Sequence, residues 1–305
     1  GSTMMSLLRA EFRKLARPLV WAAGLTVTGF CLLITWGAAN NARNGMASPR
    51  IPGICDHAVT AQCRHVIGQA HAAANAAAAA TSTLAQPGEI GHVAAGMLAS
   101  LPGLVLIALV AGAHWGGEWG LRTIRQLLSR QGRRGLVLVA KWLTITSAGI
   151  ATMLTCWAVL ALAGPLIAAG AGLPAAHGGL WTGFGSSAAA VGRAALVLGL
   201  FAAVAVAAGT IGRGQLATAA ITAGVFVLAL LLAGIASVGR LSPASFVEAW
   251  MSFARSGYLP TNFWSRFSAG GGRHLGQVAG LAGIAITAAI AGVAARWRFG
   301  ADVTV

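Results

Sequence analysis

The chain has 305 residues, of which 57% are hydrophobic and only 9% are charged, whereas soluble domains carry about 25% charged residues. Its 21 Lys and Arg residues outnumber its 6 Asp and Glu residues, so the formal net charge is +15. This composition excludes a soluble enzyme, a disordered tail and a secreted disulfide scaffold. The Arg residues lie in short segments between long apolar runs, so the charge does not indicate nucleic-acid binding. The sequence predicts an all-α integral membrane protein that forms a single transmembrane domain.

The chain begins with residues 1–3, which resemble the remnant of an expression tag, and residues 4–17 then predict an amphipathic helix. Its apolar stripe contains Phe12, and the neighbouring stripe contains Arg9 and Arg13. A helix of this kind lies along the inner leaflet, with its Arg side chains at anionic lipid phosphates. We therefore expect an interfacial helix that ends where Pro18 begins the first span.

Six apolar runs are long enough to cross a bilayer, which needs about 20 residues. They cover residues of about 18–39, 92–115, 142–164, 188–211, 215–237 and 275–295. Basic residues are dense in the amino-terminal segment and between the second and third spans, and sparse in the first outer loop, residues 40–91. The positive-inside rule therefore places both termini of this multi-pass protein in the cytoplasm.

A second amphipathic helix is predicted between the second and third spans, over residues 118–131. Its apolar stripe contains Leu121 and Ile124, and its polar stripe contains Arg122 and Arg125. The polar face of such a helix either docks on a soluble partner or lies against lipid phosphates. From the residues alone both interpretations stay open.

The first outer loop contains Cys55 and Cys63, which on the oxidising side of a membrane are expected to form a disulfide. Their spacing to His57 and His65 also allows a metal site with two thiolates and two imidazoles. No standard metal-binding spacing is matched, so we expect the disulfide and no metal. An Ala-rich run, residues 69–84, predicts a short helix after this pair.

The last outer loop, residues 238–274, contains a helix start at Ser242-Pro243 and an apolar stripe that includes Phe246 and Trp250. This helix is expected to act either as an extracellular gate or as an interfacial cover on the bundle. Arg193 lies near the outer end of the fourth span. Its side chain either extends outward to the headgroups or lines a cavity, so Arg193, Phe246 and Trp250 are the candidate cavity or gate residues.

The spans contain almost no ionisable residues, and the chain has no GxxxxGK[ST] phosphate-binding loop. Nor does it show a clustered acid, base or metal set, which argues against an intramembrane enzyme. We therefore expect no enzyme activity and no cofactor in this chain. If the protein transports a substrate, another subunit must supply the energy.

The segment after the second span resembles the ABC-2 type permeases, the transmembrane subunits of ATP-binding-cassette exporters. In that family an acidic residue closes the second span, a Gly-Thr and Leu-Leu-Ser pattern follows, and a Lys opens the third span. The matching residues here are Glu118, Gly120, Thr123, Leu127-Leu128-Ser129-Arg130, Arg134 and Lys141. The chain departs from the family pattern at Gln131-Gly132, where the family often has Pro, and in the two residues between Gly120 and Thr123.

The resemblance implies that two permease chains pair, as a homodimer or with a related chain, and that two copies of a cytoplasmic ATPase subunit bind ATP and Mg. The residues that it assigns to contact with the ATPase are Glu118, Arg122, Arg125, Arg130, Arg133 and Arg134. The pair would export an apolar or amphipathic compound, such as a drug, antibiotic, peptide or lipid, across a bacterial inner membrane. The alternative is a non-transporting scaffold or sensor that anchors a cytoplasmic partner among membrane lipids.

Overall fold

The computed structural model of the chain contains only helices among the regular elements that it describes. Six of these helices are long and apolar enough to cross a membrane, which confirms the predicted class of multi-pass helical membrane protein. The described residues are 2–16, 18–47, 61–84, 86, 88–120, 134–173, 182–233, 235, 241–251 and 275–301.

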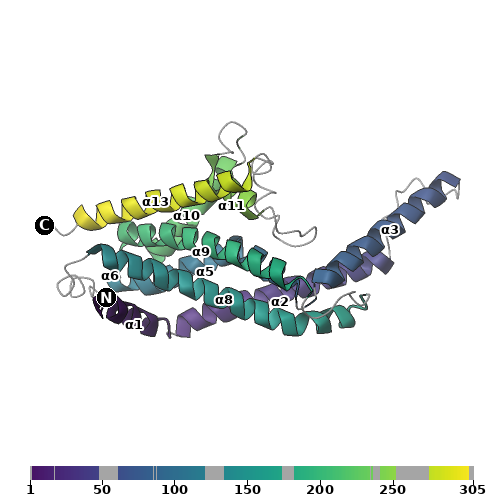
Figure 1. The fold of residues 1–305 in the computed structure, drawn as a ribbon, viewed down its shortest axis with the longest axis horizontal. Coiled ribbons are helices and arrows are strands. Elements are labelled where there is room, and N and C mark those ends of the chain that lie inside the picture. Colours follow the sequence, from purple (N-terminus) through teal and green to yellow (C-terminus); the bar gives the residue numbers. More distant parts are fainter. Residues whose placement is uncertain are drawn as a thin grey trace.

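The long helices run side by side along the long axis of the molecule (Figure 1). Helix α1 and the last residues of α13 lie at one end, here named the α1 end, and α3 projects beyond the bundle at the other. The elements in chain order are α1 (Ser2–Lys14), α2 (Pro18–Ala47), α3 (Ala61–Leu84), α4 (Gly91–Leu98), α5 (Leu101–Ala111), the π-helical turn η2 (Gly112–Gly116), α6 (Gly117–Gly120), α8 (Arg134–Gly170), α9 (Phe184–Gly212), α10 (Gln215–Ala233), α11 (Pro243–Met251) and α13 (Gln277–Ala301).

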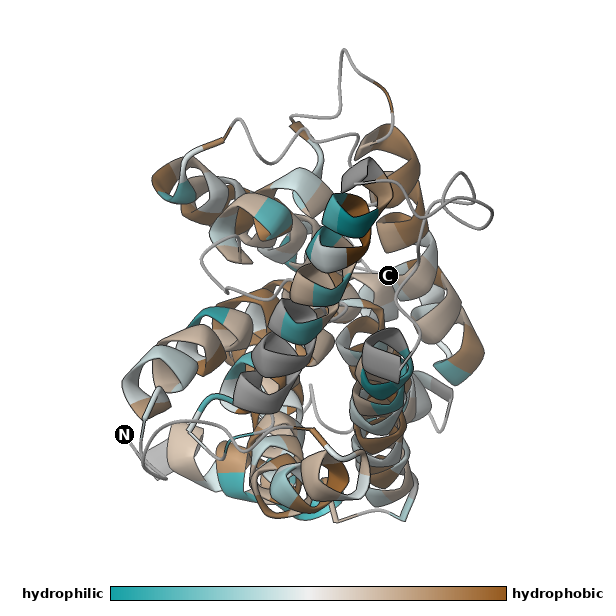
Figure 2. Ribbon diagram, turned by 90° about the vertical axis from the view of Figure 1, so that its right-hand side faces the viewer, coloured by the Kyte–Doolittle hydropathy of each residue, from teal (hydrophilic) through white to brown (hydrophobic). Residues whose placement is uncertain are grey.

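Helices α5 and α9 form the centre of the bundle, and the other long helices surround them. Most of α9 between Ser187 and Thr210 is buried, since its many Ala and Gly residues let neighbouring helices approach closely. The surrounding spans bury one face and expose large apolar side chains, such as Leu162 at 78% and Val293 at 69%. In Figure 2, brown hydrophobic stretches of the ribbon lie on outer faces of several helices. An apolar surface of this extent is suited to contact with lipid.

The second span begins at Leu101, whereas the sequence predicted a start near His92. Residues Gly91–Leu98 form the separate short helix α4, because Ser100 is extended and Pro102 stands in the first turn of α5. The turn between the helices is so tight that a Cβ at Gly103 would lie 1.8 Å from the carbonyl oxygen of Leu98. An uninterrupted apolar run therefore contains two helices.

Two other helices also differ in extent from the predicted ranges, and a third starts where it was predicted. Helix α8 has 37 residues and starts at Arg134, ahead of the predicted start near Trp142. Helix α3 starts at Ala61 and includes the predicted Ala-rich run. Helix α11 begins at Pro243, where the Ser242 hydroxyl accepts the N–H of Ala244 at 3.3 Å, and is described as far as Met251.

Candidate functional site

The principal polar feature of the described interior is a group of charged side chains at the α1 end, here named the ionic cluster. Helix α1 contributes Glu11 and Lys14, the second span contributes His114 and Glu118, and α8 contributes Lys141. Lys141 has no exposed surface, Glu11 is 1% exposed and Glu118 is 5% exposed. Buried charges of this kind require partners, because their desolvation is otherwise very unfavourable.

The partners of these charges come from three elements, α1, the second span and α8. The Nζ atom of Lys141 donates to Oε2 of Glu11 and to Oε1 of Glu118, each at 2.5 Å. The Nζ atom of Lys14 donates to Oε1 of Glu11 at 2.8 Å and to Oε1 of Glu118 at 2.6 Å. Two ammonium groups thus alternate with two carboxylates, and their formal charges cancel. Such charge-assisted hydrogen bonds are among the stronger polar contacts in proteins.

His114 extends the ionic cluster from the π-helical turn η2. Its Nε2 atom lies 2.9 Å from Oε2 of Glu11, although the two groups are not aligned as a regular hydrogen bond. The π-helical turn places His114 and Glu118 on the side of the second span that faces α1 and α8. Single π-helical turns inside α-helices are rare and often mark functional positions.

The pKa values of Glu11 and Lys14 on α1 are shifted by their neighbours in the ionic cluster. Burial alone would raise the pKa of the Glu11 carboxyl, but the nearby His114 ring and the charges of Lys141 and Lys14 outweigh burial and lower that pKa well below its ordinary value of 4.5. Burial alone would lower the pKa of Lys14, but Glu11 and Glu118 outweigh it and raise that pKa above 10.5. Both side chains are therefore charged across the neutral range.

Aromatic side chains pack beside the ionic cluster and fix its position against α9 and α13. The Trp115 ring is fully buried, lies 5.4 Å from Nζ of Lys141, and donates from Nε1 to the carbonyl of Val206 at 3.1 Å. Phe299 of α13 contacts both Trp115 and Trp119, with ring centroids 5.9 and 6.1 Å apart. Through these close-packed rings, a displacement of α8 or of the second span would also displace α13.

The ionic cluster connects α1 with both ends of the segment 121–133. Glu118 lies just before this segment, and Lys141 lies in the second turn of the helix that follows it. Removing one partner of a buried ion pair costs about 3–5 kcal/mol. The ionic cluster therefore holds α1, the second span and α8 together at the α1 end.

The predicted coupling residue Glu118 and the predicted interfacial-helix residues lie in different environments. Glu118 is buried within the ionic cluster, whereas Arg9, Phe12 and Arg13 are exposed on α1. Contact of Glu118 with an ATPase stays a prediction, because in this conformation its carboxylate faces Lys14 and Lys141. Arg134 begins α8, and its side chain lies outside the described residues, as do Arg122, Arg125, Arg130 and Arg133.

Arg193, Phe246 and Trp250, the candidate cavity or gate residues, lie together where α11 meets α9 and α13. The guanidinium of Arg193 donates to the carbonyl of Trp250 at 3.1 Å and to Oε1 of Gln277 at 3.3 Å. The indole of Trp250 in turn donates to the carbonyl of Arg193 at 3.1 Å. Through these hydrogen bonds Arg193 links α9 to α11 and α13. A gating role for α11 stays a prediction.

The cysteines divide into bonded and free residues. Cys63 is disulfide-bonded, and therefore is not available as a thiolate metal ligand, while Cys55 lies outside the described residues. Cys31 and Cys156 are free and buried. Within the described part of the chain, no group of three or more His, Cys, Asp or Glu side chains is arranged to hold a metal ion.

The ionic cluster was not predicted from the sequence, where Glu118 and Lys141 were noted only for their resemblance to the family pattern and Glu11 was given no role. A signal was nevertheless present. Glu11 is the one acid in a basic amino-terminal segment, and it stands three residues from Lys14 on the same helical face. The chain has only six acids, and two of them, Glu11 and Glu118, lie next to the ends of spans. Acids in such positions are candidates for buried ion pairs with Lys or Arg.

Comparison of the chain with models of protein families, with curated proteins and with solved structures finds no match. Its function is therefore inferred from the ionic cluster, the arrangement of the spans and the sequence pattern between Glu118 and Lys141.

Proposed function

We propose that the protein is the permease subunit of an ATP-binding-cassette exporter. The observation that supports this most is the ionic cluster, which ties the amino-terminal helix and both flanks of the segment 121–133 into one buried unit. A membrane protein driven by a separate ATPase needs such a link between its cytoplasmic elements and its spans. The sequence of the segment, with its Arg residues, resembles the coupling region of ABC-2 type permeases.

In this proposal ATP and Mg bind only to the partner ATPase, two copies of which serve a pair of permease chains in a bacterial inner membrane. Closure of the ATPase moves α1 and the segment 121–133, and the ionic cluster transmits that displacement to α8 and the second span. Both termini lie in the cytoplasm. The apolar spans favour an apolar or amphipathic substrate that moves outward.

The test uses the full chain purified from its native host in mild detergent, followed by mass spectrometry of the proteins that accompany it. The expected result is an ATPase subunit with a phosphate-binding loop. The variant Arg125→Glu should lower recovery of that ATPase by about tenfold or more, because it reverses a charge at the proposed contact. Arg64→Glu is the matched control, since Arg64 is exposed on α3 at the opposite end.

A thermal melt of each variant separates loss of the contact from loss of the fold. If Arg125→Glu and Arg64→Glu recover the same amount of ATPase, Arg125 does not contact the ATPase and the coupling assignment is wrong. A preparation that keeps the ATPase but shows no substrate-stimulated ATP hydrolysis or efflux in vesicles would assign the chain to the alternative, a scaffold or sensor. Repeated purification without any ATPase would overturn the proposal.

A further inference from the structure

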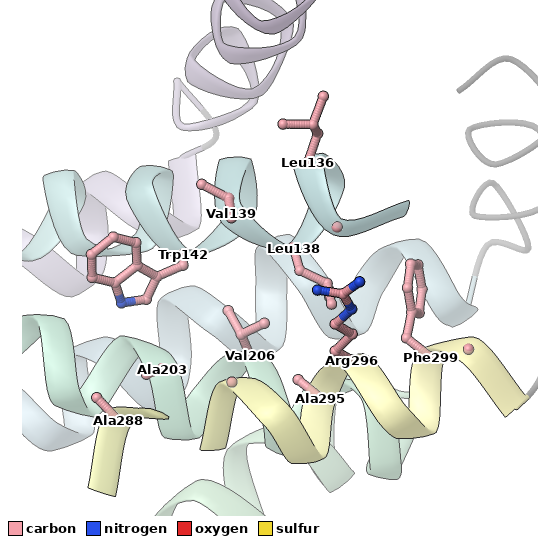
Figure 3. Close-up of a pocket in the computed structure, with 13 residues that line it drawn as sticks. Leu136, Leu138, Val139, Trp142, Ala203, Val206, Ala288, Ala295, Arg296 and Phe299 are labelled. Carbon is pink, nitrogen blue, oxygen red and sulfur yellow. The ribbon is translucent and has the colours of Figure 1, made fainter. Parts of the chain in front are cut away.

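A groove of about 840 Å³ runs between α8 and α13 at the α1 end, with α9 as its floor. Figure 3 shows Val139 and Trp142 of α8 on one side and Ala295, Arg296 and Phe299 of α13 on the other. Its volume falls in the range of ligand pockets, about 300–1,000 Å³. The groove is separate from the ionic cluster, and none of the predicted site residues lines it.

The groove exists because α13 presents small residues toward α8. Ala288, Gly292 and Ala295 recur at helical spacing along this face and line the groove. A Cβ at Gly292 would meet no atom within 4 Å, so the space beside it is open. Larger side chains at these positions would fill the volume that the two helices leave between them.

The walls of the groove are rigid although its interior is open. The Trp142 indole donates from Nε1 to the carbonyl of Gly199 at 2.8 Å, which fixes the ring against α9. Phe299 is held by Trp115 and Trp119. A site whose walls are already fixed loses little conformational entropy when a ligand binds.

The groove opens onto the apolar outer surface of the bundle. Val139 and Trp142, which line it, are 44% and 36% exposed. This surface is the part of the molecule suited to lipid contact. A hydrocarbon chain can therefore enter the groove laterally without crossing water.

Arg296 is the charged residue of the groove lining. Its side chain reaches from α13 across the groove toward Leu138 of α8 (Figure 3). Within the described residues no carboxylate forms an ion pair with it. A planar guanidinium at the mouth of an apolar groove is suited to a phosphate, which it binds through two parallel hydrogen bonds.

We propose that this groove is a binding site for an anionic phospholipid of the surrounding membrane. One acyl chain lies along Ala288, Gly292 and Ala295, and the headgroup phosphate is bound by Arg296. The site also adjoins Phe299, which contacts Trp115 of the aromatic group beside the ionic cluster. The proposal does not depend on the exporter function.

The experiment measures lipid binding to the full-length, detergent-purified protein by native mass spectrometry. Phosphatidylglycerol and phosphatidylcholine with identical acyl chains are the probes. The wild-type protein should prefer phosphatidylglycerol. Arg296→Gln should weaken phosphatidylglycerol binding by about tenfold, as expected for loss of one charge-assisted contact. It should weaken phosphatidylcholine binding less, because the choline ammonium already balances the phosphate charge. Gly292→Leu fills the groove and should weaken both lipids.

Two matched controls lie on the same helix. Arg298→Gln removes an exposed charge that does not line the groove, and Ala294→Leu enlarges an exposed residue on another face. Both should bind lipid as the wild type does. Equal losses in Arg296→Gln and Arg298→Gln would show diffuse charge attraction and overturn the site. Undiminished binding in Gly292→Leu would overturn the acyl-chain position. A dimer that Gly292→Leu disrupts without a change in lipid binding would assign the groove to a second copy of the chain.

Discussion

Lys141 is a lysine with no exposed surface, and its ammonium group is held between the carboxylates of Glu11 and Glu118. The three side chains come from elements far apart in the sequence, since Glu11 and Lys141 are separated by 130 positions. Each residue alone resembles an ordinary charge at a membrane edge. Only the packing of α1 against α8 shows that they desolvate one another.

Replacement of Lys141 by Met should strongly destabilise the protein. It retains most of the side-chain volume but leaves two buried carboxylates with Lys14 as their lysine partner. We expect a loss of about 3–5 kcal/mol in the free energy of unfolding. The measurement is the thermal unfolding midpoint of the purified protein in detergent.

Lys14→Met is the control for this prediction, because the Lys14 side chain is 30% exposed and its removal should cost less. The double variant Lys141→Met with Glu118→Gln should recover part of the loss, since it leaves Glu11 paired with Lys14. A Lys141→Met protein as stable as the wild type would contradict the structural role of the ionic cluster.

At the scale of single elements, α1 shows what a helical pattern can and cannot predict. The sequence predicted a helix with an apolar stripe that contains Phe12. In the structure Phe12 is 44% exposed, and Met5 on the same helix is 63% exposed. The polar residues divide into two groups that the pattern did not separate. Arg9 is exposed, whereas Glu11 faces the bundle together with Leu7.

Docking of α1 should depend on pH at both extremes. The pKa of Glu11 is lowered in the folded state, so its contribution is complete above about pH 4.5 and is lost as the pH falls toward the lower folded value. The pKa of Lys14 is raised, so its contribution is complete below about pH 10.5 and is lost as the pH rises through the folded value.

A spin label at the exposed residue Ala10 can report this docking through its mobility. We expect constant mobility between about pH 5 and pH 10 and increased mobility outside that range. In the variant Glu11→Gln the acidic transition should be absent. A transition near neutral pH in the wild type would be inconsistent with the ionic cluster as the docking contact.

The packing of α11 on α13 depends on Gly283. A Cβ at this position would lie 2.3 Å from Cγ of the Phe246 ring, closer than atoms can approach. Gly283→Ala should therefore destabilise the contact by about 1–3 kcal/mol. In the double variant with Phe246→Leu, the thermal unfolding midpoint should recover in part. Gly224→Ala is the single-site control, because a Cβ at Gly224 would meet no atom within 4 Å. Additive losses in the double variant would contradict this contact.

At the scale of the molecule, the composition and the six apolar runs were sufficient to predict a six-span helical protein. The break at Ser100 was not predicted, because a single Pro within an apolar run is compatible with either a kink or a new helix. The new helix starts here because the turn brings Gly103 close to the Leu98 carbonyl. This contact depends on the geometry of the turn and is not visible in the sequence. The partners of Lys141 and Arg193 were hidden for a similar reason, since they depend on how the helices pack.

The even number of spans predicts that α1 and the end of α13 lie on the same side, and the positive-inside rule predicts that this side is the cytoplasm. A fluorescent protein fused after Ala301 should be bright, and alkaline phosphatase at the same position should be inactive. Fusions to a chain truncated after Ala47, beyond the first span, should show the reverse. Active phosphatase after Ala301 would place the ionic cluster on the outer side and contradict the exporter proposal.

The π-helical turn Gly112–Gly116 sets the direction in which Glu118 points. A π-helical turn accommodates an extra residue, and each residue of an α-helix advances the next by about 100°. If the same residues closed as a regular α-helix, Glu118 would be rotated by about 100° relative to the residues before Gly112 and would turn away from Lys141. Such a change keeps every member of the ionic cluster in the chain, yet it changes the angular phase of Glu118. In this span the path of the backbone is thus as much a part of the site as the identity of its residues.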